Sequence, residues 1–322
     1  MPAAHLYVAR TLTAAVMDEL PGLGVPLVVG EIAPPTRERL LTDVAGAVAA
    51  IVTLTERIDA EFFDAAGSQL KVVANVAVGF DNIDLAEAKR RGVVITNTPG
   101  VLDDATADHT VAMLLALTRR VVEADRFARS GEPWIWGPTM MVGLDISAGA
   151  TLGIVGFGRI GRAVARRAAA FGMRIVTAST DLEPGTQVAG VDVVTLPELL
   201  ATSDVVSLHV PLLPSTRHLI DGAAIASMKP GAYLINAARG GVVDEAALIE
   251  ALRSGRLAGA ALDTFEGEPT INPALRELDT VVLQPHIASA GDVTRDNMCR
   301  LAVRNVTRVL AGEPAETPVP LP

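Results

Sequence analysis

The stretch TLGIVGFGRIG, residues 151–161, joins an apolar run to a glycine-rich turn and then to a helical pattern. Leu152–Val155 is short and apolar, which is typical of a buried strand. Ile160–Phe171 has helical spacing and is followed by Gly172, a usual residue after the last turn of a helix. Strand, glycines and helix in this order predict a dinucleotide-binding βαβ unit.

Each glycine of this motif has a physical reason in that interpretation. Gly156 permits the tight turn, Gly158 lets the backbone approach a pyrophosphate, and Gly161 lets helix and strand pack closely. The N-terminus of the helix, with Arg159 and Ile160, offers free N–H groups to the same pyrophosphate. The weaker alternative is a glycine-rich turn that binds nothing.

Further short apolar runs alternate with helical patterns on both sides of the motif. Strands that are apolar on both faces and separated by helices indicate parallel sheets covered on both sides. A chain of 322 residues also suits two domains better than one. We therefore predict an α/β fold of two doubly wound parallel-sheet domains. The predicted strands are Leu6–Ala9, Leu27–Val29, Ala47–Thr53, Val72–Val76, Val93–Thr96, Leu152–Val155, Arg174–Ala178, Val205–Val210, Ala232–Asn236, Gly259–Leu262 and Val281–Leu283, and the predicted helices include Thr11–Leu20, Thr36–Val44, Asp59–Ala66, Leu85–Arg91, Ile160–Phe171 and Glu245–Arg253.

The segment Val101–Ser147 separates the two series of strands. Asp104–Phe127 predicts one long helix that is apolar on most sides, and Ser130–Ser147 predicts an irregular arm. Trp134 and Trp136, the only two tryptophans, lie in this arm. The arm is either a loop capped by two half-buried aromatics or a contact to another subunit.

Composition narrows the class of protein. The chain has 27 Lys and Arg against 37 Asp and Glu, a net charge of −10, so it has no excess positive charge for nucleic acid. The single cysteine, Cys299, excludes an intrachain disulfide and thiolate-rich zinc sites. No stretch approaches the roughly 18 apolar residues that span a bilayer, and Met1–Arg10 lacks the pattern of a signal peptide. We expect a soluble protein of a reducing cytoplasm, with no nucleic-acid or membrane partner.

The strand Arg174–Ala178 leads to the residues expected to bind the adenosine ribose of the cofactor. A carboxylate there binds the 2′-hydroxyl and disfavours a 2′-phosphate. Ser179 lies 18 residues past Gly161 and Asp181 lies 20 past it, so the spacing alone does not choose between them. If Ser179, followed by Thr180, takes the position, NADP(H) becomes acceptable, although no arginine or lysine follows closely to pair with a phosphate. We predict NADP(H) or NAD(H), with NADP(H) favoured.

Arg239, Glu268 and His286 each follow the end of a predicted strand. Ligands of open parallel sheets bind at the carboxyl ends of the strands, so all three residues lie on the edge that carries the glycine turn. An arginine can grip a carboxylate with two hydrogen bonds. A histidine can give or take a proton near neutral pH, and a glutamate beside it favours the imidazolium. The three together predict proton-coupled hydride transfer on an acid substrate.

Each of these residues also has a structural interpretation. Arg239 could be a surface cation, Glu268 a solvated charge, and His286 a hydrogen-bonded turn residue. Their conjunction beside a cofactor motif favours the catalytic interpretation. No His-x-x-x-His or clustered carboxylate spacing indicates a metal, so we expect none. The Gly-x-Ser-x-Gly motif of serine hydrolases is also absent.

Over nearly its full length the chain resembles the D-isomer-specific 2-hydroxyacid dehydrogenases, and within them it is most similar to glyoxylate/hydroxypyruvate reductases. The blocks that carry the resemblance occur in the family's order. They are VGFDNID at 78–84, NTPGV at 97–101, TAD at 106–108, TLGIVGFGRIG at 151–161, NAARG at 236–240, DTFEGEP at 263–269 and PHIASA at 285–290.

The resemblance implies a domain arrangement and an activity. Residues 1–100 and 291–322 would form a flavodoxin-like substrate domain, and residues 101–290 would form a Rossmann cofactor domain inserted between them. The arm within residues 101–147 would help to hold a homodimer, which would explain exposed tryptophans. The expected reaction is the reduction of glyoxylate or hydroxypyruvate to the D-2-hydroxy acid.

The resemblance also implies roles for single residues. Arg239 would bind the substrate carboxylate and help polarise the keto oxygen, His286 would be the acid/base, and Glu268 would hold it protonated. The N–H groups of Val78 and Gly79 would complete the carboxylate site. Ser179 departs from the acidic residue that NAD-using relatives usually carry. The cofactor contacts implied are Thr106, Gly156, Gly158, Arg159, Ile160, Gly161, Ser179, Thr180, His209, Val210, Pro211, Thr216, Ala237, Ala238, Arg239, Asp263, His286 and Ala288.

Three rival functions stay open. Phosphite dehydrogenases and formate dehydrogenases belong to the same superfamily, but the formate enzymes pair their histidine with a glutamine rather than an acid such as Glu268. A rival of another class is a dinucleotide-sensing corepressor, which uses the same fold as a binding module. The combination of Arg239, Glu268 and His286 favours the enzyme.

Overall fold

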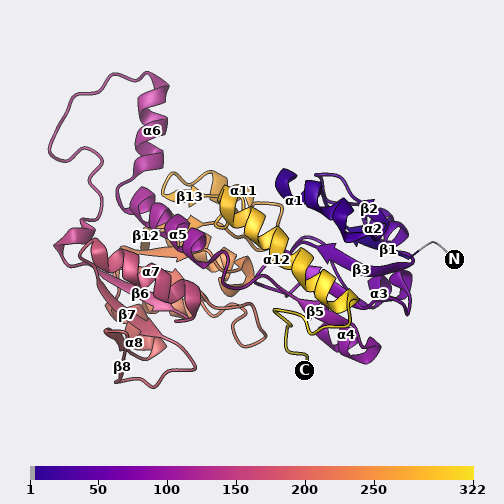
Figure 1. The fold of residues 1–322 in the computed structure, drawn as a ribbon. Helices are drawn as coiled ribbons and strands as arrows, with labels where there is room; N and C mark the ends of the chain where they lie inside the picture. Colours follow the sequence, from indigo (N-terminus) through magenta and orange to yellow (C-terminus); the bar gives the residue numbers. More distant parts are fainter. Residues whose placement is uncertain (1–3) are drawn as a thin grey trace. The chain divides into compact units, whose positions relative to one another are not determined.

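Two separate parallel sheets organise the chain, one in each of two units (Figure 1). The structure is a computed structural model that describes residues 4–322. Unit 1 runs to Leu102 and also includes Ala290–Pro322, and unit 2 is Asp103–Ser289. The chain therefore leaves unit 1, builds unit 2 and returns to complete unit 1.

The sheet of unit 1 has the strand order β2-β1-β3-β4-β5, with every pair parallel. This is the order of flavodoxin-like sheets. Helix α12 (Asp292–Leu310), from the C-terminal end of the chain, packs on β3, β4 and β5. The strands are β1 (His5–Val8), β2 (Leu27–Val29), β3 (Ala47–Val52), β4 (Val72–Asn75) and β5 (Val94–Thr96), and the connecting helices are α1 (Ala14–Glu19), α2 (Arg37–Asp43), α3 (Ala60–Ala66) and α4 (Leu85–Arg91).

Three helices of unit 1 begin directly after the polar residues that cap them. Thr36, Asp59 and Asp84 stand at the N-caps of α2, α3 and α4, and each side chain accepts a hydrogen bond from a free N–H of the first turn. Gly92 ends α4 with a φ of 69°, a conformation that glycine adopts without steric cost. The strands are buried along most of their length because their side chains are apolar on both faces.

The sheet of unit 2 has the order β13-β12-β11-β10-β6-β7-β9-β8, parallel except for the β8–β9 pair. Counted along the chain, β9-β7-β6-β10-β11-β12 is the Rossmann order 3-2-1-4-5-6. The predicted doubly wound α/β fold is confirmed in both units. The strands are β6 (Thr151–Val155), β7 (Arg174–Ala178), β8 (Gln187–Val188), β9 (Val191–Val193), β10 (Val205–Leu208), β11 (Ala232–Asn236), β12 (Leu257–Leu262) and β13 (Val281–Leu283).

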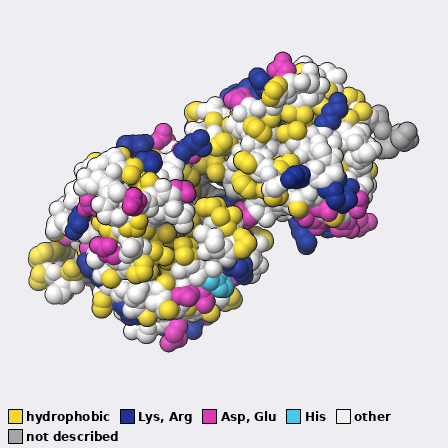
Figure 2. Space-filling view, turned by 90° about the horizontal axis from the view of Figure 1, so that it is seen from below, with side chains coloured by type: hydrophobic (Ala, Val, Ile, Leu, Met, Phe, Trp, Pro, Cys, Tyr) yellow, Lys and Arg dark blue, Asp and Glu magenta, His cyan; other side chains and the backbone are white. Residues whose placement is uncertain are grey.

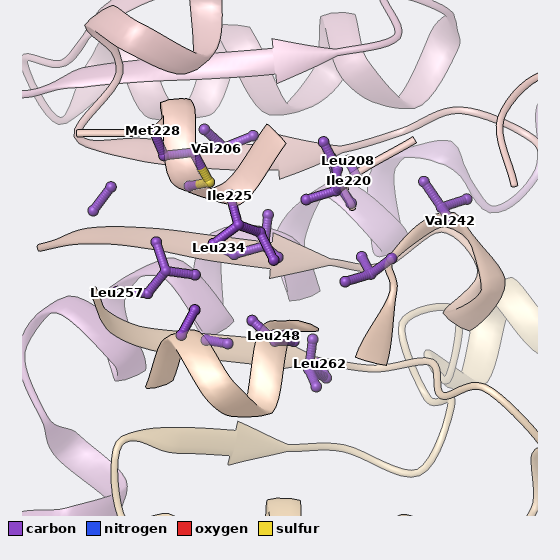
Figure 3. Packing of buried hydrophobic residues seen from close by; sticks show 14 of the residues in the cluster. Val206, Leu208, Ile220, Ile225, Met228, Leu234, Val242, Leu248, Leu257 and Leu262 are labelled. Atoms are coloured by element: carbon purple, nitrogen blue, oxygen red, sulfur yellow. The ribbon is translucent and has the colours of Figure 1, made fainter. Parts of the chain in front are cut away.

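Helices cover both faces of this second sheet. Helices α5 (Asp103–Thr118) and α7 (Arg159–Ala170) lie together on one face. Helices α8 (Leu196–Thr202), α9 (Gly222–Ser227) and α10 (Glu245–Arg253) lie on the other, and the short α11 (Pro273–Arg276) contacts β13. Figure 3 shows the second face from close by, where Leu208, Leu234 and Leu262 of three adjacent strands meet Ile225 and Leu248 of α9 and α10. This packing fixes the strand ends that carry the site residues.

The prediction of one long helix over Asp104–Phe127 is wrong. The helix breaks after Thr118, and α6 (Val121–Ser130) starts in a new direction after Arg120, whose φ is 52°. The carbonyl of Thr118 accepts a hydrogen bond from the N–H of Leu144 at 2.9 Å, so the returning end of the arm closes the helix. Arg120 also pairs with Glu123 in the first turn of α6.

Helix α6 and the arm after it project away from the sheet of unit 2 (Figure 1). No residue of α6 is buried, and Trp134 and Trp136 are 61% and 76% exposed. The alternative that the arm is a loop capped by two half-buried aromatic side chains is therefore wrong. The arm presents unpartnered apolar side chains.

Other local features also differ from expectation. The predicted helix Thr11–Leu20 is shorter, and a 3-10 turn, η1 (Leu20–Leu23), completes it. The sequence patterns did not indicate the short β8–β9 hairpin, because its strands have two and three residues. On the face that Figure 2 shows, Lys and Arg are interspersed with Asp and Glu on each unit. None of the helices within residues 4–322 has the length and hydrophobicity needed to cross a bilayer.

Candidate active site

The carboxyl edge of the unit 2 sheet gathers most of the predicted site residues. Because β6, β7, β10, β11, β12 and β13 are parallel, their ends lie along one edge. Main-chain hydrogen bonds continue past these ends, from Gly156 to Ala178, from Asp263 to Asn236 and from His286 to Asp263, at 2.8–2.9 Å. The turns that follow the strands are therefore held as firmly as the sheet itself.

The glycine turn between β6 and α7 has the geometry that its sequence predicts. Gly156 has a φ of 91°, and a Cβ there would lie 2.6 Å from the carbonyl oxygen of His209. A Cβ on Gly161 would overlap the carbonyl oxygen of Gly156, so the helix can approach the strand only without a side chain here. A Cβ on Gly158 would meet no protein atom within 4 Å. Gly158 thus borders open space at a helix N-terminus with no side-chain cap, as a pyrophosphate would require.

The end of β7 carries the residues expected to bind the adenosine ribose. Ser179 is partly buried directly after the strand, and Thr180 and Asp181 are exposed. The residue directly after the strand, Ser179, therefore carries no carboxylate, and the first one, Asp181, follows two residues after Ser179. Arg159, at the start of α7, is exposed as well.

The loop after β10 carries four predicted cofactor contacts. The side chain of His209 lies 2.8 Å from the Ser207 hydroxyl through its Nε2, and burial lowers the pKa of His209 to about 4. His209 is therefore neutral at pH 7. Thr216 organises the rest of the loop, because its hydroxyl donates to the carbonyl of Pro211 at 2.6 Å and accepts from the N–H of Leu213. Val210 and Pro211 lie between these two fixed points.

Arg239 stands in a turn that a buried asparagine closes. The Asn236 side chain, 1% exposed, donates to the carbonyl of Arg239 and accepts from the N–H of Ala238, at 2.9 and 3.0 Å. Gly240 follows, and a Cβ there would overlap the backbone of Phe265. This close approach brings the Arg239 turn against the loop that carries Glu268. Ala237 and Ala238 are partly exposed in the same turn.

Glu268 and His286 form a pair across two loops. The Nδ1 of His286 lies 2.8 Å from Oε2 of Glu268, and the other carboxylate oxygen accepts the N–H of Phe265 at 2.9 Å. No hydrogen bond joins the Nε2 of His286 to a group within residues 4–322. The pair therefore leaves one ring nitrogen for a ligand. Glu268 is an exposed residue whose two carboxylate oxygens are both engaged by hydrogen bonds.

The charge state of Glu268 follows from its neighbours. Burial by itself would raise the pKa of this carboxyl group. The hydrogen bond and charge of His286, the N–H of Phe265 and the charge of Arg239 outweigh burial and lower the pKa below its usual range. Glu268 is therefore ionised at neutral pH and places a fixed negative charge beside the His286 ring.

Asp263 shapes the turn that presents His286. It is fully buried, and its two carboxylate oxygens accept the N–H groups of Ile287 and Ala288 at 2.7 and 2.9 Å. Its carbonyl accepts the N–H of His286. These bonds stabilise the φ of 56° at His286, which is uncommon for a residue with a side chain. The Nε2 of His109 on α5 lies 3.7 Å from the same carboxylate.

The remaining predicted residues lie on α5, in the His286 turn and in unit 1. Thr106 is buried on α5, and Ala288 is buried in the His286 turn. Val78 and Gly79 belong to unit 1, in the loop after β4, where both are partly exposed. The clustering of Arg239, Glu268 and His286 is visible within unit 2, whereas the contribution of Val78 and Gly79 stays a prediction.

Sequence patterns did not identify two positioning residues. The sequence pattern places Asn236 only in a strand, and the resemblance implies that Asp263 contacts the cofactor rather than holds the His286 turn. The polar residues directly after apolar strands were the only available signal. Within residues 4–322, no three His, Cys, Asp or Glu side chains are grouped to hold a metal ion.

Comparison with known proteins agrees with this geometry. Residues 111–288 match the family model described as "D-isomer specific 2-hydroxyacid dehydrogenase, NAD binding domain". The chain is 51% identical to a glyoxylate reductase of Thermococcus onnurineus over 284 residues, which cover 86% of this chain and 84% of that protein. It is 46% identical to a glyoxylate reductase of Pyrococcus horikoshii over 309 residues, 92% of each chain.

Solved structures give the same result. A protein of Thermus thermophilus superimposes with a TM-score of 0.92 at 46% identity, covering 98% of this chain and 100% of that one. An NADPH-dependent glyoxylate/hydroxypyruvate reductase of Sinorhizobium meliloti, in complex with NADP and malonate, superimposes with a TM-score of 0.84 at 34% identity, covering 98% and 96%.

Proposed function

Because the chain belongs to the D-isomer-specific 2-hydroxyacid dehydrogenases, we propose that it reduces glyoxylate or hydroxypyruvate to the D-2-hydroxy acid with a nicotinamide cofactor. The observation that carries the proposal is the Glu268–His286 pair beside Arg239, on the edge that holds the glycine turn. Relatives about half identical to this chain are glyoxylate reductases, which supports the choice of a small substrate.

The residues of unit 2 divide the chemistry among them. A nicotinamide cofactor, when bound, would supply the hydride that the carbonyl carbon of the substrate accepts. Arg239 binds the carboxylate and holds that carbon in place. His286 donates the proton from Nε2 to the carbonyl oxygen as it gains charge, and Nδ1–H stays bonded to Glu268. One proton and one hydride enter, and the product is the 2-hydroxy acid. The N–H groups of Val78 and Gly79 in unit 1 are further donors to the carboxylate.

The same proposal includes NADP(H) as the preferred cofactor. Ser179 gives the end of β7 no carboxylate to repel a 2′-phosphate. The exposed Arg159 and Thr180 offer a cation and a hydroxyl at the same edge. The exposed carboxylate of Asp181 opposes this preference, so a moderate rather than absolute selectivity for NADPH is expected.

A homodimer and a cytoplasmic location complete the proposal. The exposed tryptophans of the arm would lose contact with water in a subunit interface, which supports a dimer. The location stays a prediction from the single cysteine and the sequence pattern.

Cofactor oxidation tests the proposed function. NADPH and NADH absorbance at 340 nm is followed with glyoxylate, hydroxypyruvate, pyruvate and a longer 2-oxo acid in parallel. Fast turnover of the first two with NADPH is expected. Turnover of bulkier acids alone would keep the family and contradict the substrate. No turnover with bound cofactor would favour phosphite oxidation or a sensor.

A further inference from the structure

The loop of unit 1 that carries Val78 and Gly79 has three consecutive carbonyl groups held by hydrogen bonds. The carbonyl of Ala77 accepts the N–H of Thr98 at 2.9 Å. The carbonyl of Val78 accepts the side-chain amide of Asn97 at 2.7 Å, and that of Gly79 accepts the side-chain amide of Asn75 at 2.9 Å. The N–H groups of Val78 and Gly79 donate to no group within residues 4–322.

Peptide geometry links these held carbonyls to the free N–H groups. In a planar trans peptide the C=O of one residue and the N–H of the next point in opposite directions. Fixing the Val78 carbonyl therefore fixes the direction of the Gly79 N–H, and Thr98 does the same for the N–H of Val78. Asn97 is the side chain that sets the orientation of the Gly79 donor.

Asn97 is itself held by the C-terminal segment of the chain. The hydroxyl of Thr317 donates to the Asn97 carbonyl at 2.6 Å. Asn305 of α12, fully buried, donates to that hydroxyl at 2.9 Å and accepts the N–H of Thr317 at 3.0 Å. A continuous set of bonds thus runs from α12 through Thr317 and Asn97 to the Val78 carbonyl.

We propose that Asn97, held by Thr317 and Asn305, is a positioning residue that aims the Gly79 N–H at the substrate carboxylate. The proposal rests on the proposed function, because that function gives these N–H groups their ligand. It assigns the C-terminal segment a role in substrate affinity in addition to its packing on the sheet.

Steady-state kinetics of the full-length protein with NADPH test this role. Asn97→Ala should raise KM for glyoxylate about 10-fold, and Thr317→Val about 3-fold, since one hydrogen bond is lost or loosened. In both variants kcat should change less than about 2-fold, and NADPH affinity should not change. Thr317→Ser keeps the hydroxyl and should restore the wild-type KM.

Thr307→Val is the matched control, because the Thr307 hydroxyl bonds only the Val303 carbonyl within α12. It should leave KM unchanged. Calorimetric titration of the NADPH complex with oxalate gives a second measurement without turnover and should show the same weakening. If the wild-type protein reduces glyoxylate and Asn97→Ala has the same KM, the positioning role is overturned and the proposed function is not. If the wild-type protein has no turnover but binds oxalate, and Asn97→Ala binds oxalate more weakly, only the proposed function is overturned. If the wild-type protein neither turns over substrate nor binds oxalate, both proposals are overturned.

Discussion

The two ring nitrogens of His286 have different partners. Nδ1 faces the carboxylate of Glu268 at 2.8 Å, and Nε2 is left for a ligand. This division is what a general acid needs, because one nitrogen is held in place and the other delivers the proton. The lowered pKa of Glu268 keeps the counter-charge present over the neutral range.

Removing that counter-charge should change the pH dependence of reduction. In Glu268→Gln the imidazolium loses its ionised partner, so the alkaline decline in rate should begin at lower pH, with kcat about 10-fold lower near pH 8 and less affected near pH 6. Because the Glu268 pKa is lowered, its carboxylate in the wild type is lost only under acidic conditions. Rate profiles from pH 5 to 9 measure both effects. Parallel profiles for the two proteins would contradict the assigned role.

His209 should make the stability of the protein depend on pH. Its pKa falls from 6.5 to about 4 on folding, so between these values the unfolded chain binds a proton that the folded protein does not. Stability is therefore complete above pH 6.5 and decreases as the pH falls toward 4, by at most about 3 kcal/mol. Urea unfolding of wild type and His209→Gln at pH 4.5 and 7 should show a smaller difference between the two pH values in the variant. Equal differences would contradict the lowered pKa of His209 in the folded protein.

At the scale of elements, the glycine turn separates packing from ligand binding. Gly161→Ala places a Cβ on the Gly156 carbonyl and should destabilise the fold by about 1–3 kcal/mol. Gly158→Ala meets no protein atom, so the loss of stability should be limited to the poorer N-cap preference of alanine, about 1 kcal/mol or less. Its Cβ would occupy the space at the start of α7, so NADPH affinity should fall about 10-fold or more. Thermal unfolding and cofactor titration distinguish the two variants. Unchanged affinity in Gly158→Ala would contradict the pyrophosphate site.

The elements that could be predicted are those with a clear local pattern. Apolar runs such as Ala47–Val52 and the motif around Gly158 indicate their own structure, because burial on both faces favours apolar residues throughout. The break after Thr118 could not be predicted, since it depends on the Leu144 N–H, which is distant in sequence. Local pattern does not encode such a contact.

The same limit applies to the site. That Arg239, Glu268 and His286 stand in the loops after parallel strands could be predicted from their positions, whereas their catalytic roles stay a prediction. The supporting roles of Asn236 and Asp263 could not be predicted, because each depends on which backbone groups lie within hydrogen-bond distance in the folded chain. Sequence thus indicates the chemistry of a site better than the contacts that orient it.

At the scale of the whole molecule, the arm should determine the oligomeric state. Trp134→Ser combined with Trp136→Ser removes two exposed aromatic side chains and should convert a dimer of 33.5-kDa chains to monomers. Sedimentation equilibrium measures the mass directly. Ile32→Ser is the control, because Ile32 is exposed on unit 1 and outside the arm. A double variant that stays dimeric, or a monomeric wild type, would contradict the arm as an interface.

The proposed cofactor-binding and substrate-binding groups are distributed over the two units. Residues 111–288, nearly the whole of unit 2, match the NAD-binding domain of the family, and the proposed catalytic residues Arg239, Glu268 and His286 stand in that unit. The proposed carboxylate donors Val78 and Gly79 stand in unit 1.

The most direct test of the proposed chemistry is turnover by His286→Ala with NADPH and glyoxylate, compared with wild type and with His218→Ala. His218 also pairs with a glutamate, Glu266, and serves as the matched histidine. His286→Ala should lower kcat about 10²–10⁴-fold with NADPH affinity nearly unchanged, because the proton donor is lost but the cofactor site remains. His218→Ala should retain most of the activity. Wild-type turnover that persists undiminished in His286→Ala would contradict His286 as the acid that completes the reduction.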